Sequence, residues 1–473
     1  MGALGSAAAA LATAAALLSG CSPGPERERA EPPRRTAGPA NPGQPSFFVV
    51  LIDTLRRDHL RAYGYERETA PRITALAGES VVFDRCVTVC PWTNPAIASL
   101  FSGRYPQAVF PAAPHEFAVN QALPDELDLL AERLQRAGYR TLAFIDHPGI
   151  NRWLQFHQGF DEFTVLPPGW RKWAGSEQAR VVDEVRRQLD TTGEQPFYFY
   201  VHLIYPHEPY RPPPPHAGHF GPGFEQVRRR EKDGIVNRYD EEILYTDQVV
   251  GSMLDELQAR GLVDSTYIVI VSDHGEAFWE HDLQGHGNSF FEELLAVPLV
   301  VRPPGGRRGE PARIADPVSF VDVPATILDL AGIAAADDDD GTSLAPYLVP
   351  GRERARRDGP LFSENAHSAV ISGLAAQDGR YKLVYAMREP LHDEAVLRED
   401  VAAGRNMLLF DLQDDPGELK PLPYDHAGAG PRLGQAMLAH WQRNQAFRKT
   451  LSPTEAKMSP EAKERLHTLG YVQ

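Results

Sequence analysis

Short apolar runs rich in β-branched and aromatic residues alternate with helical patterns along the body of the chain. Three of these runs, Phe47–Ile52, Phe197–Leu203 and Thr266–Val271, have the length and continuity of strands buried on both faces of a parallel sheet. Helical patterns lie between them, for example over 126–139 and 236–260. The alternation predicts an α/β fold with a large, mostly parallel central sheet flanked by helices.

The pattern changes after residue 360. Strand-like stretches over 369–386 and 407–419 are separated by turn signals, which predicts a small antiparallel sheet. We therefore expect a main domain over 46–350, a C-terminal subdomain over 351–430 and a helical tail over 431–473.

The first 45 residues lack both patterns. Residues 1–21 are almost all Ala, Leu, Gly and Ser and end at Cys21 in a sequence that resembles a bacterial lipobox. The run has the length of a signal peptide and is shorter than a membrane span of about 20 residues. The alternative is an uncleaved apolar tail, because no Lys or Arg precedes the run. Residues 22–45, rich in Pro, Arg, Glu and Gly, predict a disordered tether.

A lipid on Cys21 would anchor the chain to the membrane of the bacterial cell envelope, with its body facing the periplasm. Ser22, in place of Asp, favours the outer membrane.

Charge and cysteine content narrow the class of protein. The net charge of −16 over 473 residues argues against a nucleic-acid partner. A locally positive site around a metal ion would still accept an anionic substrate. The three cysteines do not make a disulfide scaffold. Cys86 and Cys90 either pair with each other or act as small buried hydrophobic side chains.

Polar side chains follow two of the predicted strands at their carboxyl ends, where open α/β sheets bind ligands. Asp53 ends the first run, and Asp273 and His274 follow the third. Gly275 gives the backbone freedom to turn both side chains toward one point. Carboxylate and imidazole groups suit Zn²⁺ or Mn²⁺. On these residues alone, a capping role for Asp273 with His274 at the surface is an equal alternative.

Three further residues have the chemistry of a site. Thr93 lies near the start of a predicted helix, where backbone N–H groups favour an oxyanion, although Thr is also a common helix cap. His207 follows a strand between two prolines, and His286 stands between two glycines. The four aspartates at 337–340 are either a Ca²⁺ site or a solvated loop.

In this order and spacing, the motifs resemble the sulfatase family of the alkaline phosphatase superfamily over residues 46–422. That family places an early Asp, a nucleophile and a late Asp-His pair around a metal ion. The resemblance therefore implies a site of Asp53, Thr93, Asp273 and His274 with one divalent ion, either Zn²⁺, Mn²⁺ or Ca²⁺. The matching pieces are LIDTLRRDHL, WTNPAIASLFSGRYP, YVHLIYPHEPY, SDHGEAFWEHD, GHGNSFFEELLAVPLVV, FVDVPATILDLAG, GRYKLV and LLFDLQDDPGEL.

The sequence departs from the arylsulfatase pattern at two places. Thr54 stands where a second aspartate is usual, and the Cys-x-Pro-x-Arg motif becomes Thr93, Pro95 and Ile97. Threonine cannot be oxidised to the formylglycine aldehyde, so no formylglycine is expected. The chain looks more like the threonine-nucleophile branch, which includes phosphodiesterases, phosphonate ester hydrolases and phosphoglycerol or phosphoethanolamine transferases.

Members with two metal ions need an Asp, a His four residues later and a distant His. Asp247 and His286 match the outer positions, but Gly251 occupies the middle one. The resemblance thus implies a single ion and leaves His286 to contact substrate oxygens. It also implies that His207 protonates the leaving group.

Two basic residues are candidates for substrate binding. Arg56 would replace the anion contact that is lost at Ile97. Lys382 would reach the site from the C-terminal subdomain; the alternative is a lysine on a strand surface.

The expected function is that of a metal-dependent hydrolase or transferase acting through Thr93 on small anionic phosphate, phosphonate or sulfate esters, including those of envelope lipids or glycans. Sulfate esters are less favoured, because a sulfated Thr93 would hydrolyse slowly without the hemiacetal route of formylglycine. The alternative is a non-catalytic lipoprotein that keeps a structural metal and binds an anionic glycan or lipid. A pure binding module, however, does not need Asp53, Asp273, His274, His207 and His286 together.

Overall fold

The computed structural model describes residues 43–452 and 454, apart from 111–120, 167–176, 222–231, 308–311, 354–356, 358, 366–371, 388–390 and 392. The expected signal peptide with its lipobox, nearly all of the tether and the end of the tail lie outside the described residues. Within the described part of the chain, every helix is too short or too polar to cross a membrane.

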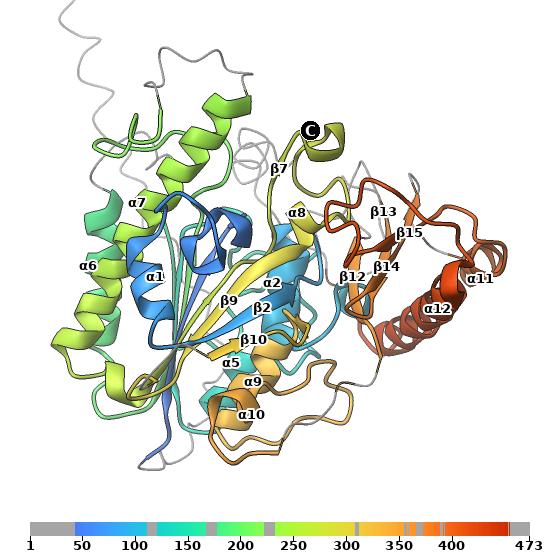
Figure 1. Cartoon of the computed structure of the whole chain (residues 1–473). Helices are drawn as coiled ribbons and strands as arrows, with labels where there is room; N and C mark the ends of the chain where they lie inside the picture. The colour runs from blue at the N-terminus through green and yellow to red at the C-terminus, as the bar shows by residue number, and fades with distance from the viewer. Residues whose placement is uncertain are drawn as a thin grey trace, which may run out of the picture. The chain divides into compact units, whose positions relative to one another are not determined.

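A large twisted sheet forms the centre of the main domain (Figure 1). Strand β1 runs parallel to both of its neighbours, as the apolar runs predict. Strand β9 is the exception, because it runs antiparallel to the strands on either side of it. The order is β10 (Ala312–Ile314), β2 (Val81–Val87), β9 (Ala296–Arg302), β6 (Thr266–Val271), β1 (Ser46–Ile52), β5 (Phe197–Leu203), β3 (Arg140–Ile145) and β4 (Glu162–Val165), with β11 (Val318–Ser319) beside β2.

The continuous apolar pattern of β1 has a direct structural cause. Every residue of this strand is buried. Phe47, Val49 and Leu51 pack into the core on one face of the sheet, and Phe48 and Val50 pack into the core on the other. Because helices cover both faces, neither set of side chains is in contact with water.

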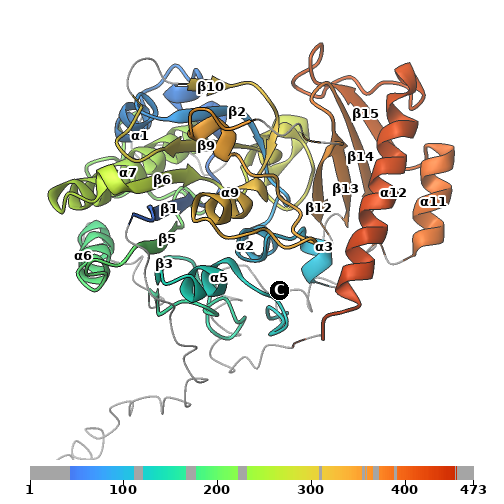
Figure 2. The ribbon, with the colours of Figure 1, turned by 90° about the horizontal axis from the view of Figure 1, so that it is seen from below.

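The helices divide between these two cores (Figure 2). Helices α1 (Pro71–Ala77), α6 (Glu177–Leu189) and α7 (Lys232–Ala259) cover one face of the sheet. Helices α2 (Thr93–Ser102), α5 (Leu130–Arg136) and α9 (Asp322–Leu330) cover the other. Shorter elements are α3 (Pro106–Val109), α8 (Glu292–Leu295), α10 (Ala345–Leu348), the pair β7 (Ala277–Phe278) and β8 (Gln284–Gly285), and 3-10 turns at Arg57–His59, Arg61–Tyr63, Val263–Ser265, Glu280–Asp282 and His426–Gly428.

The C-terminal region forms the small antiparallel sheet that its sequence predicts. Helix α12 packs on this sheet and α11 packs on α12 (Figure 1). The sheet joins the main domain through β12, where the Ser363 hydroxyl donates to the carbonyl of Thr88 at 2.6 Å. The elements are β12 (Leu361–Asn365), β13 (Ser372–Gln377), β14 (Tyr381–Met387), α11 (Glu394–Ala403), β15 (Met407–Asp411) and α12 (Ala429–Arg448).

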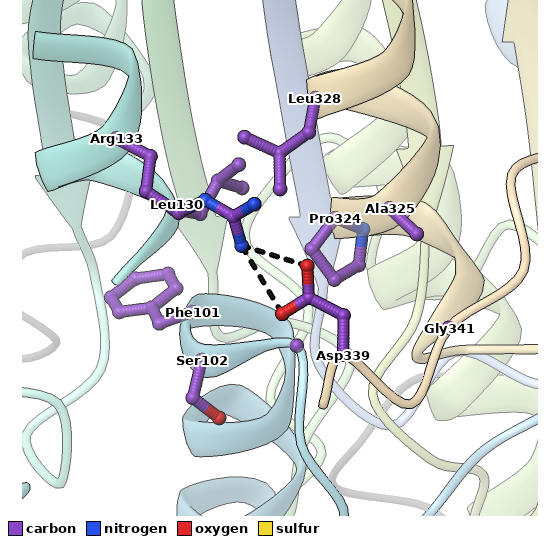
Figure 3. Close-up of a pocket in the computed structure, with 10 residues that line it drawn as sticks. Phe101, Ser102, Leu130, Arg133, Pro324, Ala325, Leu328, Asp339 and Gly341 are labelled. Atoms are coloured by element: carbon purple, nitrogen blue, oxygen red, sulfur yellow. Dashed lines mark hydrogen bonds and ion pairs between the residues drawn. The ribbon is translucent and has the colours of Figure 1, made fainter. Parts of the chain in front are cut away.

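Three of the four aspartates at 337–340 hold a loop against the C-terminal end of α2. Asp338 pairs with Arg104, and Asp339 pairs with Arg133 of α5 at 2.9 Å (Figure 3). Asp340 accepts the backbone N–H of Tyr105 at 3.1 Å. Asp337 and Asp338 are exposed to solvent, as expected of a solvated loop. Asp339 and Asp340 are bound by protein groups, which speaks against a Ca²⁺ cage of all four carboxylates. The crevice beside this ion pair has a volume of about 10 Å³, roughly the room of one water molecule.

Both cysteines of the main domain are fully buried and unbonded to each other. Burial raises the pKa of the Cys86 and Cys90 thiols well above its usual range. The interpretation as small hydrophobic side chains is confirmed, and a disulfide between them is excluded.

Candidate active site

Three predicted metal ligands meet at the carboxyl edge of the central sheet. Asp53 follows β1, and Asp273 and His274 follow the neighbouring β6. One ligand atom from each lies within 4.8 Å of the others, and all three residues are fully buried. The Nε2 atom of His274 lies 3.5 Å from Oδ2 of Asp273 and 3.8 Å from Oδ1 of Asp53.

The loops that present these side chains are tightly fixed. Oδ1 of Asp273 accepts the backbone N–H groups of Thr54 at 3.3 Å and of His274 at 2.9 Å. Thr54 itself has a left-handed φ of 55°, which turns the chain sharply after Asp53. Gly275 is needed for a different reason from the one expected, because a Cβ there would lie 2.0 Å from the carbonyl oxygen of Glu293. Close approach, rather than an unusual φ, explains this glycine.

The oxygen and nitrogen atoms that are left over after these hydrogen bonds suit a cation. Oδ2 of Asp273 is buried and has no hydrogen-bond partner. Burial raises the pKa of Asp273, which expresses the cost of an uncompensated buried charge. Nδ1 of His274 lies 2.9 Å from the carbonyl oxygen of Gly275. Because a carbonyl can only accept, Nδ1 carries the proton and the lone pair of Nε2 faces the carboxylates.

Burial also lowers the pKa of His274 to about 3, so the ring is neutral at physiological pH. Two carboxylates and the lone pair of a neutral imidazole thus converge at one place. The residues therefore fit the divalent metal ion that the sequence predicts.

Thr93 completes this cluster. It is the first residue of α2, and Trp92, which makes no side-chain cap, occupies the N-cap position. The Oγ1 atom of Thr93 lies 3.2 Å from Nε2 of His274 in a fully buried position. The simple capping role for Thr93 is therefore wrong, since Trp92 occupies the cap position and the Thr93 hydroxyl contacts the ring of His274.

Two of the predicted catalytic histidines lie beside the cluster. The ring of His286 stands between those of His274 and His207, with centroid distances of 4.6 and 4.9 Å. Burial alone would lower the pKa of His286, but the Glu276 carboxylate raises it above its usual value. His207 donates from Nδ1 to the carbonyl oxygen of Glu208 at 2.6 Å, which fixes the orientation of its ring.

The sequence-based reasoning missed two histidines that contact Asp53. Nε2 of His147 lies 3.4 Å, and Nε2 of His202 lies 3.7 Å, from Oδ2 of Asp53. Both rings are buried. A signal for His147 was present, because Asp146 and His147 follow β3 just as Asp273 and His274 follow β6. His202 is the one ionisable side chain besides tyrosines in the apolar run of β5.

Neither candidate for substrate binding is supported by its contacts. The buried Arg56 guanidinium pairs with Asp58 at 2.7 Å and with Glu280 at 3.0 Å. Lys382 is fully buried and pairs with Glu292 at 3.1 Å and with Glu418 at 2.9 Å. Both cations already have carboxylate partners, and the alternative of a surface lysine is wrong as well.

Asp247 does not belong to a second metal site. Its oxygens accept the backbone N–H groups of Arg72 at 2.9 Å and of Ile73 at 2.8 Å, at the start of α1. Gly251 lies against the side chain of Arg72. Asp247 serves the first turn of α1, so its match to an outer position of a two-metal site does not reflect a role in metal binding.

Known proteins resemble this chain over most of its length. A model of the sulfatase family matches residues 45–333. Choline-sulfatase of Rhizobium meliloti (strain 1021) is 26% identical over 88% of this chain and 90% of that protein. Human arylsulfatase A is 23% identical over 84% of this chain and 88% of that protein.

Solved structures share the fold. A putative sulfatase from Bacteroides thetaiotaomicron VPI-5482 superposes with a TM-score of 0.68 at 20% identity, covering 89% of this chain and 96% of that one. The phosphonate monoester hydrolase of Agrobacterium radiobacter gives a TM-score of 0.64 at 21% identity, covering 87% and 96%. The family model covers more than half of the chain and includes Asp53, Thr93, Asp273 and His274. The chain belongs to the sulfatase family of the alkaline phosphatase superfamily, whose members hydrolyse sulfuric and phosphoric esters.

Proposed function

We propose that this chain is a metal-dependent ester hydrolase in which Thr93 is the nucleophile. One observation carries the proposal. The Thr93 hydroxyl, at the first residue of α2, lies 3.2 Å from Nε2 of His274 and shares a buried cluster with Asp53 and Asp273. Such a hydroxyl has no role in the helix itself, and its neighbours are the groups that activate a nucleophile.

Asp53, Asp273, His274 and Thr93 would hold one divalent ion. The nitrogen ligand favours Zn²⁺ or Mn²⁺ over Ca²⁺, which prefers oxygen ligands throughout. When bound, the ion lowers the pKa of a neighbouring hydroxyl and offsets the charge of the ester oxygens.

The protein itself supplies the remaining steps. Thr93 Oγ, after its proton has passed to solvent, forms a bond to phosphorus or sulfur while the bond to the leaving oxygen breaks, and His207 gives that oxygen a proton. His286 and the free N–H groups at the start of α2 donate to the non-bridging oxygens. Water then attacks the same centre and gives a proton to His207. The bond to Thr93 Oγ breaks, and Thr93 regains its proton from solvent. An acceptor alcohol in place of water would make the same site a transferase.

The substrate class we propose is a small anionic ester. Curated relatives include a choline-sulfatase and an ulvan-active sulfatase, and one solved relative was determined with D-glucosamine-2-N,6-O-disulfate. Phosphate and phosphonate esters are favoured over sulfate, since a sulfated threonine lacks the hemiacetal route that releases sulfate from formylglycine. A head group of an envelope lipid or a glycan fits this class.

The test is a side-by-side assay of the wild type, Thr93→Ala and Thr93→Ser with p-nitrophenyl sulfate, a phosphate monoester, a phosphodiester and a phosphonate monoester. Each is assayed with Zn²⁺, Mn²⁺ or Ca²⁺, and Thr191→Ala, a variant at an exposed helix end, is the matched control. We expect turnover of a phosphorus ester that disappears in Thr93→Ala and persists in part in Thr93→Ser. Turnover that survives Thr93→Ala contradicts the proposal, and bound metal without turnover of any ester favours the non-catalytic binder.

We propose further that the chain is a lipoprotein of the bacterial cell envelope, anchored through Cys21 and facing the periplasm. The apolar segment that ends at Cys21 supports this location. Metabolic labelling with a palmitate analogue should mark the wild type and leave Cys21→Ala unmarked. Equal labelling of both would contradict the anchor.

A further inference from the structure

A chain of hydrogen bonds leads from the active-site histidine His286 to a buried tyrosine. Nδ1 of His286 lies 2.9 Å from Oε1 of Glu276. The other carboxylate oxygen, Oε2, accepts the hydroxyl of Tyr210 at 2.9 Å. Three different loops supply these groups, which follow β5, β6 and β8. The contacts therefore join residues that are far apart in sequence. Glu276 also lies only two residues after the predicted metal ligand His274.

Glu276 is held in place by its backbone as well as by its side chain. Arg56 donates from Nη1 to the carbonyl oxygen of Glu276 at 2.9 Å. The preceding Gly275 lies so close to Glu293 that a side chain at residue 275 would not fit. Glu276 is fully buried, and Tyr210 is only 5% exposed. A carboxylate fixed in this way is a rigid acceptor. It is already in position before the substrate binds.

This arrangement fixes which nitrogen of His286 faces the reacting group. Because a carboxylate only accepts, Nδ1 of His286 must carry a proton and point to Glu276. Nε2 is then the nitrogen on the side of the ring away from Glu276. The ring is further confined between the rings of His274 and His207. Rotation of the ring would break the bond to Glu276 and leave a buried carboxylate oxygen unsatisfied, which is costly.

We propose that Glu276 and Tyr210 are positioning residues that fix the orientation of His286, so that its Nε2 faces the oxygens of the substrate. This role rests on the proposed ester hydrolysis at Thr93. Glu276 acts directly on His286, and Tyr210 acts one step further away by holding Glu276. Arg56, which sequence reasoning assigned to the substrate, serves instead to hold the backbone of Glu276.

The kinetic test compares kcat for Glu276→Ala, Glu276→Gln and Tyr210→Phe on the ester that the wild type hydrolyses best. Glu276→Ala removes the acceptor, and we expect kcat to fall about 100-fold with a much smaller change in KM. Glu276→Gln keeps an oxygen that accepts the Nδ1 proton, so it should recover part of this loss. Tyr210→Phe should lower kcat about 3- to 10-fold, the effect of one hydrogen bond. Tyr65→Phe removes a similar 2.8 Å bond to Asp240 outside the site and is the matched control.

A double-mutant cycle separates positioning from general damage. If Glu276 and Tyr210 act through His286, Glu276→Ala and Tyr210→Phe should have little further effect on kcat in a His286→Ala background. If Glu276→Ala or Tyr210→Phe lowers kcat by the same factor in the His286→Ala background as in the wild type, the proposal is overturned.

A spectroscopic readout does not depend on turnover. In protein labelled with ¹⁵N-histidine, His286 should give a slowly exchanging Nδ1–H resonance, assigned by its absence in His286→Gln. The resonance should persist in Glu276→Gln, shift in Tyr210→Phe and disappear in Glu276→Ala. If it persists unchanged in Glu276→Ala, the positioning role is wrong, whatever the activity. A wild type without turnover whose resonance still depends on Glu276 would reject the proposed function while supporting the positioning of His286.

Discussion

Two buried clusters of aspartate and histidine, one at the active site and one beside it, differ in how their oxygens are satisfied. Asp240 of α7 receives His59 at 2.6 Å on one oxygen, and Tyr65 at 2.8 Å and Arg67 at 2.7 Å on the other. Asp273 receives two backbone N–H groups on Oδ1, while its buried Oδ2 has no hydrogen-bond partner. The two carboxylates have the same chemistry and the same burial.

The difference teaches how a structural carboxylate is told from a metal ligand. Every oxygen of Asp240 is used by a protein donor, so its buried charge is compensated within the fold. At Asp273 the nearest side-chain nitrogen is the lone-pair side of His274, which cannot donate. Acceptors that converge in a buried place need a cation. Without the cation, holding them together lowers the stability of the folded protein.

The largest effect on the stability of the metal-free protein should come from the satisfied cluster. Asp240→Ala leaves His59, Tyr65 and Arg67 without their common acceptor and should lower the free energy of unfolding by about 3 kcal/mol. Urea denaturation in the presence of EDTA measures it. A variant as stable as the wild type would show that the two clusters do not differ as described.

Metal binding should stabilise the protein through the other cluster. At a concentration of about 100 times its Kd, Zn²⁺ or Mn²⁺ should raise the free energy of unfolding by about 2.7 kcal/mol. Asp273→Asn should abolish this gain, with little loss of stability in EDTA, because it neutralises an uncompensated buried charge. Asp240→Asn is the matched control and should keep the gain. Equal metal stabilisation in both variants would place the ion elsewhere.

The pH dependence of the free energy of unfolding should reveal a buried neutral histidine in the active-site cluster. Burial lowers the pKa of His202, next to Asp53, to about 4, against about 6.5 in an unfolded chain. The unfolded state therefore binds more protons below pH 6.5, so stability is lost as the pH falls from about 6.5 toward 4. In EDTA, His202→Phe should remove about 2 kcal/mol of the loss between pH 6.5 and pH 5, measured by urea denaturation. An unchanged slope would mean that His202 is not buried in its neutral form.

The smallest expected effect comes from Tyr65→Phe. It removes one hydrogen bond to Asp240 and should lower the free energy of unfolding by about 1 kcal/mol. Metal affinity and kcat should stay at the values of the wild type. A fall in metal affinity would show that the Asp240 cluster is coupled to the active site.

The sequence predicts the part of the site that depends on strand ends. Asp53, Asp273 and His274 each follow a continuous apolar run, and parallel strands bring such positions to one edge. His147 obeys the same rule, because the pair Asp146-His147 follows β3 as Asp273-His274 follows β6. The antiparallel direction of β9 could not be predicted, because a strand buried on both faces has the same pattern in either direction.

The basic residues show where sequence reasoning fails. Arg56 looked available for an anionic substrate, yet it pairs with Asp58, two residues further on, and with Glu280, at a separation of 224 residues. Lys382 pairs with Glu292 at a separation of 90 residues. Pairing at such separations is decided by tertiary packing, which no local pattern contains. The role of Asp247 at the start of α1 could not be predicted for the same reason, since Arg72, whose N–H it accepts, lies 175 positions away.

The central claim is that Thr93 forms a covalent intermediate with the ester. The most direct measurement is mass spectrometry of peptides from enzyme quenched with acid during turnover of a phosphorus ester. We predict one added phosphoryl group on the peptide that contains Thr93, and its absence in Thr93→Ala. An adduct on another residue, or undiminished turnover by Thr93→Ala, would contradict the account.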